Sequence, residues 1–79
     1  MHAFPNPFTD LLTIDLEQII NDLSVSARNP LGQEVYYDLF KSTRLVQLSI
    51  PGPAGVYYVT LESKHQSLVK IKVLKLEGE

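Results

Sequence analysis

The side chains in this chain that come closest to a catalytic grouping are a serine and a nearby histidine. Ser63 and His65 would point to the same face of a β-strand, which places a hydroxyl nucleophile beside an imidazole base. A working hydrolase site also needs an acid that orients the base, and we find no acid placed for that role. His2, the other histidine, is isolated near the N-terminus. We therefore predict no catalytic residues and a chain that is not an enzyme.

Carboxylates are the remaining candidates for metal binding. Asp10, Asp15, Glu17 and Asp22 lie in one stretch, but their spacing does not match a calcium-binding loop. A calcium site assembled from separate loops stays open as an alternative. The chain has no cysteine, which excludes disulfides and thiolate metal sites. It also lacks a glycine-rich loop that would cradle a phosphate. We expect no metal and no cofactor.

The composition is that of one small globular domain. The 79 residues are 44% hydrophobic and 20% charged, and the net charge is −2; this balance favours a folded core over disorder. Acidic and basic residues are interspersed, so we expect no surface for nucleic acid and no polybasic membrane anchor. The apolar runs fall far short of the roughly 20 residues that span a bilayer. We predict a single domain, residues 1–79, with no nucleic-acid partner.

Short alternating segments dominate the chain and predict its fold class. In most segments apolar and polar residues alternate with the period of a half-buried β-strand, and residues 56–61 have the β-branched and aromatic content of a central strand. Pro, Gly and Asn turns separate the segments. No connection is long enough for a crossover helix, so the strands should pair antiparallel. The pattern predicts an all-β, antiparallel β-sandwich of about six or seven strands. The segments are residues 12–16, 23–28, 34–39, 45–50, 56–61 and 68–73.

Residues 15–23 are ambiguous. Leu16, Ile19, Ile20 and Leu23 have the spacing of an amphipathic helix face. A helix of this length would be short, and both neighbouring segments favour strands. We therefore favour a strand end, a loop and a second strand here, with the helix as the alternative.

Two turns have clear chemistry. In residues 29–33, Asn29 would cap the turn and Gly32 would supply its left-handed position. Residues 51–55 contain two prolines and two glycines, and such a segment cannot join a central sheet ladder. A polar connection is expected at residues 41–43, and a hairpin tip at residues 63–66.

The four tyrosines occur as two adjacent pairs, at residues 36–37 and 57–58. On a strand, one tyrosine of each pair should face the core and the other should face outward. The outward tyrosines could form a platform that stacks on carbohydrate. Core packing and cross-strand pairing also explain the tyrosines. A carbohydrate-binding or adhesive module therefore stays open as an alternative function, as does a structural spacer.

Three signatures and a lysine-rich last strand together resemble a known family. The chain reads Phe-Pro-Asn-Pro-Phe from residue 4, Leu-Gly-Gln-Glu-Val from residue 31 and Pro-Ala-Gly-Val-Tyr from residue 53. The last strand carries lysines at positions 70, 72 and 75. In this order and spacing they are similar to the type A C-terminal sorting domain of cargo proteins of the type IX secretion system in Bacteroidota. The likeness covers about residues 3–75. Carried over from the family, the sorting-motif residues are Pro5, Asn6, Pro7, Gly32, Gln33, Gly55, Tyr57, Lys72 and Lys75.

The resemblance implies a fold and a function. Domains of this family are similar to immunoglobulin-like sandwiches and stand at the C-terminus of larger secreted cargo. The parent would cross the inner membrane by its own signal peptide, and no such peptide is visible before residue 4. From the periplasm the domain would direct the parent through the outer-membrane translocon. A sortase-like peptidase would then remove the domain, and the cargo would stay on the cell surface or be released.

The last strand is the segment that the resemblance marks as most directly recognised. We expect residues 67–75 to form a sheet edge to which a receptor adds a strand, with the lysines setting specificity by charge. The same lysines could instead protect an exposed edge against aggregation. An open edge could also pair with a second copy in a weak homodimer.

Overall fold

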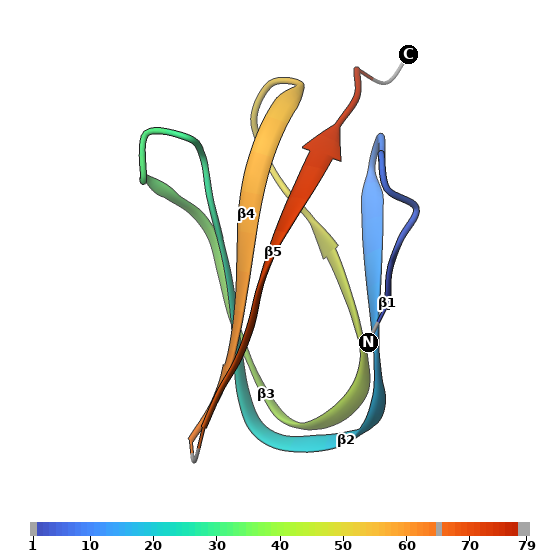
Figure 1. Cartoon of the computed structure of the whole chain (residues 1–79), viewed down its shortest axis with the longest axis vertical. Helices are drawn as coiled ribbons and strands as arrows, with labels where there is room; N and C mark the ends of the chain where they lie inside the picture. Colours follow the sequence, from blue (N-terminus) through green and yellow to red (C-terminus); the bar gives the residue numbers. More distant parts are fainter. Residues whose placement is uncertain (1, 65, 78–79) are drawn as a thin grey trace.

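The computed structural model describes residues 2–64 and 66–77, and its elements are five β-strands joined by turns (Figure 1). Every pair of neighbouring strands is antiparallel. The described residues contain no helix that is long and apolar enough to cross a bilayer. The strands are β1 (His2–Phe4), β2 (Leu11–Arg28), β3 (Glu34–Ser49), β4 (Gly55–Ser63) and β5 (Gln66–Lys75).

β2 organises the sheet because it has different neighbours along its length. Its first part pairs with β1 on one side and with the end of β3 on the other. Its last part pairs with the start of β3 and with β4, and β4 then pairs with β5. One layer therefore contains β1 with parts of β2 and β3, and the other contains the remaining parts of β2 and β3 with β4 and β5.

A bend in β2 lets one sheet supply both layers. The pairing register with β3 shifts between Asp15 and Ile20, and Glu17 and Asp22 have φ angles of 67° and 52°. Residues other than glycine seldom adopt this left-handed backbone. The Asp15 carboxylate accepts a hydrogen bond from the Glu17 amide at 2.9 Å, which supports the turn locally. Figure 1 shows β2 and β3 turning together at the end of the molecule that is lowest in the view.

The interruption predicted at residues 15–23 is thus a bend within one strand, and the helix alternative is wrong. The polar connection expected at residues 41–43 also lies within β3, where Ser42 pairs with Asn21 and Thr43 with Ile20. The all-β antiparallel prediction is confirmed. The described residues form five strands instead of the expected six or seven because β2 and β3 each continue through a position where we expected a break.

The core lies between the two layers and is wholly apolar among the described residues. The alternation read from the sequence decides which residues enter it. Leu12 is fully buried on β2, whereas its neighbour Leu11 is 50% exposed. Ile19, in the bend, is 67% exposed, which is why the helical spacing was misleading. The buried residues are Phe8, Leu12, Ile14, Leu16, Leu23, Val25, Ala27, Val46, Leu48, Ile50, Tyr57, Val59, Leu61 and Val73.

Leu11 and Leu12 provide a matched test of this packing. Leu12→Ala should lower the free energy of unfolding by about 3 kcal/mol, because it removes buried methyl groups and leaves a cavity. Leu11→Ala should lower it by less than about 1 kcal/mol, because this side chain is half exposed. Urea unfolding followed by circular dichroism measures both values. Equal losses in the two variants would contradict the assigned faces of β2.

Candidate functional site

The residues that the resemblance singles out gather at one end of the molecule. Residues 5–10 connect β1 to β2, residues 29–33 connect β2 to β3, and residues 50–54 connect β3 to β4. These connections and the last residues of β5 lie opposite the bends of β2 and β3, at the upper end of Figure 1. Segments that are far apart in the sequence are therefore close together in space.

The first motif is joined directly to the end of β5. The Asn6 side-chain oxygen accepts a hydrogen bond from the Leu74 amide at 3.2 Å. The Phe8 amide donates to the Leu74 carbonyl at 3.0 Å, and the Leu76 amide donates to the Phe8 carbonyl at 2.7 Å. The Phe8 side chain is 1% exposed and belongs to the core. We call residues 6–8 with residues 74–76 the terminal clasp, because it joins segments near the two ends of the chain.

Sequence reasoning predicted a role for Asn6 but overlooked Phe8. Phe8 forms an isolated parallel bridge with Lys75, although all the strands themselves pair antiparallel. Its position after Pro7 and before two polar residues gave no alternation from which burial could be inferred. The visible signal was only its size, since a large aromatic side chain in a small domain is a strong candidate for the core.

Lys75 contacts a turn that lies well before it in the sequence. Its ammonium group donates to the Ile50 carbonyl at 2.6 Å and to the Gly52 carbonyl at 2.8 Å. Hydrogen bonds from a charged donor are short and stronger than neutral ones. Lys75 is half-buried and its charged end is used within the domain. Its role in this structure is to hold the turn of residues 50–54 against the end of β5.

Tyr57 secures the same turn from inside. Its side chain is 3% exposed, and its hydroxyl donates to the Pro53 carbonyl at 2.6 Å. Gly52 has a φ of +115°, and a Cβ atom there would stand 2.7 Å from the Tyr57 hydroxyl. Both the backbone angle and the close approach require glycine at this position. Gly55 pairs with Lys75 across β4 and β5, so this motif residue also adjoins the last strand.

The middle motif forms the expected turn. The Asn29 side-chain oxygen accepts hydrogen bonds from the Leu31 and Gln33 amides, each at 3.0 Å. Its side-chain amide donates to the Gln33 side chain at 2.8 Å, and Gly32 has a φ of +86°. The predicted cap and left-handed glycine are both confirmed. A surface groove of about 300 Å³ lies between this turn and the turn that Lys75 holds, lined by Asn29, Pro30, Leu31, Val35, Pro51, Gly52, Pro53, Ala54, Gly55, Val56 and Tyr57.

Lys72 lies apart from this hydrogen-bonded network. It is exposed on the outer face of β5, where it pairs with Tyr58 of β4. The neighbouring Lys70 is also exposed, and its ammonium lies 5.8 Å from the centre of the Tyr58 ring. The two lysines of the terminal motif therefore differ, because Lys75 is bound within the fold whereas Lys72 faces solvent.

The tyrosine pairs divide as predicted. Tyr57 enters the core and Tyr36 packs against it, while Tyr37 is 55% exposed and Tyr58 carries Lys70 over its ring. Burial of the Tyr36 phenol, with the Asp38 carboxylate beside it, raises the pKa of this tyrosine. The strand β2 separates the outward tyrosines of β3 and β4, so they do not form one continuous stacking platform.

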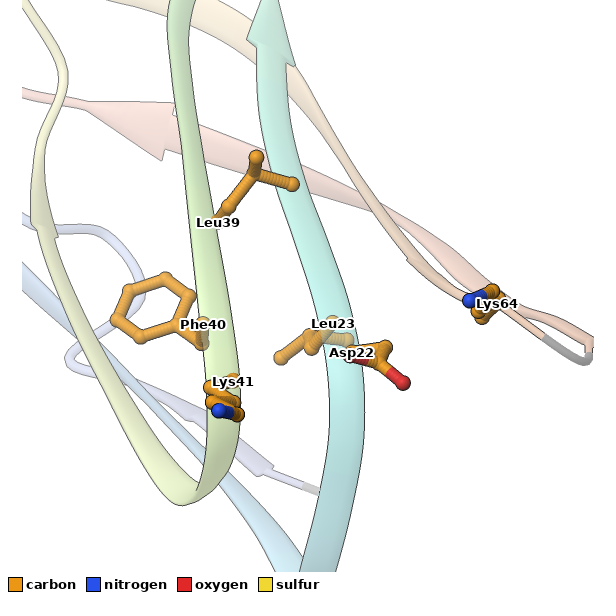
Figure 2. A pocket seen from close by; sticks show the side chains of 6 residues that line it. All are labelled: Asp22, Leu23, Leu39, Phe40, Lys41 and Lys64. Atoms are coloured by element: carbon orange, nitrogen blue, oxygen red, sulfur yellow. The ribbon is translucent and has the colours of Figure 1, made fainter.

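The larger surface hollow lies away from the motif residues. It measures about 490 Å³ and is lined by Asp22, Leu23, Leu39, Phe40, Lys41 and Lys64 (Figure 2). In Figure 2 the side chains of Leu39 and Phe40 leave β3 in different directions, and Lys64 stands across from them on the hairpin of β4 and β5. The sequence gave no indication of this hollow.

The candidate chemical groups are not assembled into a site in the part of the chain that the structure describes. Ser63 ends β4, and His65 lies outside the described residues. No group of three metal-ligating side chains occurs among residues 2–64 and 66–77. Asp15 uses its carboxylate within the bend of β2, and Asp10 accepts a hydrogen bond from the Ser49 hydroxyl at 3.2 Å.

The two motif lysines offer a direct test of their different environments. Lys75→Met should lower the free energy of unfolding by about 2 kcal/mol, because two carbonyl groups lose a charged donor. Lys72→Met removes the same charge from an exposed position and should change it by less than about 0.5 kcal/mol. The comparison uses urea midpoints. An unchanged midpoint for Lys75→Met would show that its two hydrogen bonds add nothing to stability.

Alanine substitutions at Gly52 and Gly32 distinguish the cost of backbone strain from the cost of a steric clash. Both have positive φ, but only at Gly52 would a Cβ atom meet another group. Gly32→Ala should cost about 1 kcal/mol of unfolding free energy, and Gly52→Ala about 3 kcal/mol. Adding Tyr57→Phe to Gly52→Ala should recover part of the difference, since it removes the hydroxyl that the methyl group meets. Equal costs at both glycines, with no recovery, would contradict the close approach.

Comparison with known proteins bears directly on this end of the molecule. Neither curated proteins nor solved structures give a match to the chain. A family model described as the secretion system C-terminal sorting domain matches residues 2–75. The match includes every motif residue and both halves of the terminal clasp except Leu76. The chain therefore belongs to the family of secretion system C-terminal sorting domains, which are the C-terminal sorting signals of type IX secretion.

Proposed function

We propose that this domain is fused to the C-terminal end of a larger cargo protein and acts as its address from the periplasm outward. Type IX cargo is exported to the cell surface or the extracellular space, and sorting involves the secretion machinery and the cargo. The parent crosses the inner membrane first, and the folded domain then presents the cargo to the outer-membrane translocon. A sortase-like peptidase separates the domain from the cargo, which stays on the surface or is released.

The observation that carries this proposal is the gathering of the sorting-motif residues at one end of the fold. Asn6, Lys75 and Tyr57 each make a hydrogen bond that ties a connecting segment to one of the last two strands, β4 or β5. The first motif, the turn of residues 50–54 and the end of β5 therefore hold one another in position. Such a role requires no catalysis.

A consequence is that the machinery recognises the folded end of the domain and not a linear peptide. The last strand carries exposed Lys72 beside buried Val73, and its end is held by the terminal clasp. Deleting the last strand would therefore remove recognition and core together, and loss of sorting would have two explanations. Single substitutions that unfold the domain from a distant position are more informative.

The first experiment is to fuse residues 1–79 to the C-terminus of a fluorescent reporter that carries a signal peptide. We expect the reporter at the surface or in the medium of a type IX-competent bacterium. In a translocon-deficient strain, or without the domain, we expect it in the periplasm. A reporter that stays in the periplasm in the competent strain would overturn the proposed function.

Two neighbouring substitutions test whether the folded state is recognised. Leu12→Asp places a charge in the core and should unfold the domain, whereas Leu11→Asp places it at a half-exposed position. We expect export of the reporter to be lost with Leu12→Asp and kept with Leu11→Asp. Circular dichroism of the purified domains confirms which variant is folded. Efficient export of the unfolded variant would show that a linear sequence is sufficient.

A further inference from the structure

The layer that contains β4 and β5 has two lateral edges, and the edge formed by β3 is protected. Asp38 lies on this strand, and its carboxylate accepts a hydrogen bond from the Leu39 amide at 2.8 Å. The Tyr36 hydroxyl donates to the same carboxylate at 3.4 Å. A charged side chain that occupies an edge amide hinders the addition of another strand. β3 is therefore a poor site for strand addition at this point.

The edge formed by β5 is open over a short, defined length. The amide and the carbonyl of Leu74 both bond to residues 6–8, on the side of β5 away from β4. Because peptide groups alternate in direction along an antiparallel strand, those of Lys70 and Lys72 point to the same side. No described residue pairs with them there. The terminal clasp closes this edge at Leu74 and leaves the peptide groups before it available.

The two faces of this open edge differ in chemistry. Val69 and Ile71 pair with buried residues of β4, so they lie on the core side of the sheet. Lys70 and Lys72 lie on the outer side and are exposed. A strand added here would have one row of side chains on the core side of the sheet and one row on the outer side. Its inner side chains would extend the apolar surface, and its outer side chains would lie beside two positive charges.

The β5 strand of a second copy is a poor partner for this edge. If β5 pairs antiparallel with β5 of the second copy, a lysine of one copy lies directly opposite a lysine of the other, whether the pairing is centred on Lys70, Ile71 or Lys72. Like charges directly opposite each other on neighbouring strands are destabilising. The occupant that satisfies both faces is a strand of opposite charge.

We propose that the β5 edge at residues 69–72 binds an extended segment of another protein in which apolar and acidic residues alternate. This inference rests on the proposed function, because the partner would belong to the secretion machinery that recognises the domain. Backbone hydrogen bonds to Lys70 and Lys72 provide the affinity, and the acidic side chains provide the specificity. The terminal clasp limits the register by ending the site at Leu74.

The test uses the isotope-labelled full chain and a synthetic peptide of about seven residues that alternates glutamate with valine, long enough to cover the edge. We expect the amide signals of Lys70 and Lys72 to shift and to gain protection from hydrogen exchange, while the Leu39 amide is unaffected. A peptide that alternates lysine with valine should not bind. Shifts confined to β3, or equal binding of both peptides, would overturn the proposal, as would the absence of any shift.

Charge reversal supplies the matched control. The double variant Lys70→Glu with Lys72→Glu should lower the affinity of the domain for the glutamate peptide about tenfold, and it should allow the lysine peptide to bind. The double variant Lys41→Glu with Lys64→Glu changes the net charge equally at the hollow shown in Figure 2 and should leave both peptides unaffected. An equal loss in both double variants would show a general charge effect and would contradict an edge site.

The reporter experiment distinguishes the two levels of the proposal. If the unmodified fusion is exported and the purified domain ignores the peptide, the edge inference fails and the sorting function stands. If the unmodified fusion is not exported, the sorting function itself fails. Sedimentation of the domain alone over a range of concentrations tests the second copy, and self-association that survives the Lys70→Glu and Lys72→Glu changes would favour another surface.

Discussion

The bend in β2 is the constraint on which the rest of this fold depends. A chain of 79 residues has little apolar surface to bury, and one flat sheet with no second layer would leave its apolar face in water. By turning between Asp15 and Ile20, β2 carries β3 with it and brings Leu12 and Val25 of the same strand into one core. The positive φ angles at Glu17 and Asp22 are the local cost of that geometry.

The bend also determines which connections come together at the far end. Because β2 and β3 both double back, the connections of residues 5–10, 29–33 and 50–54 all lie opposite the bend (Figure 1). The terminal clasp and the Lys75 ammonium then join the first and the last of these connections to the end of β5 through backbone carbonyls and amides. Most of the residues that the family resemblance singles out therefore hold turns and strand ends in place at this end of the molecule.

Lys72 and Lys75 show how one motif can serve two purposes. They lie on opposite faces of β5 because their separation is an odd number of residues. The inward lysine is bound to the carbonyls of Ile50 and Gly52, and the outward lysine keeps its charge in solvent beside an open sheet edge. The lysine-rich sequence motif alone does not tell which lysine is bound within the fold and which is exposed. The pleat of the strand separates them.

Much of this protein could be predicted from local chemistry alone. Alternation indicated a buried face that includes Leu12, Val25 and Val73, and the side chain of Asn29 with the backbone freedom of Gly32 specified a turn, because both effects act over a few residues. Tertiary structure alone decided that residues 15–23 bend without a break, that Phe8 closes the edge of β5, and that Lys75 reaches Ile50. Those contacts join residues far apart in the sequence, and only the packing of two layers around one core determines which of them meet.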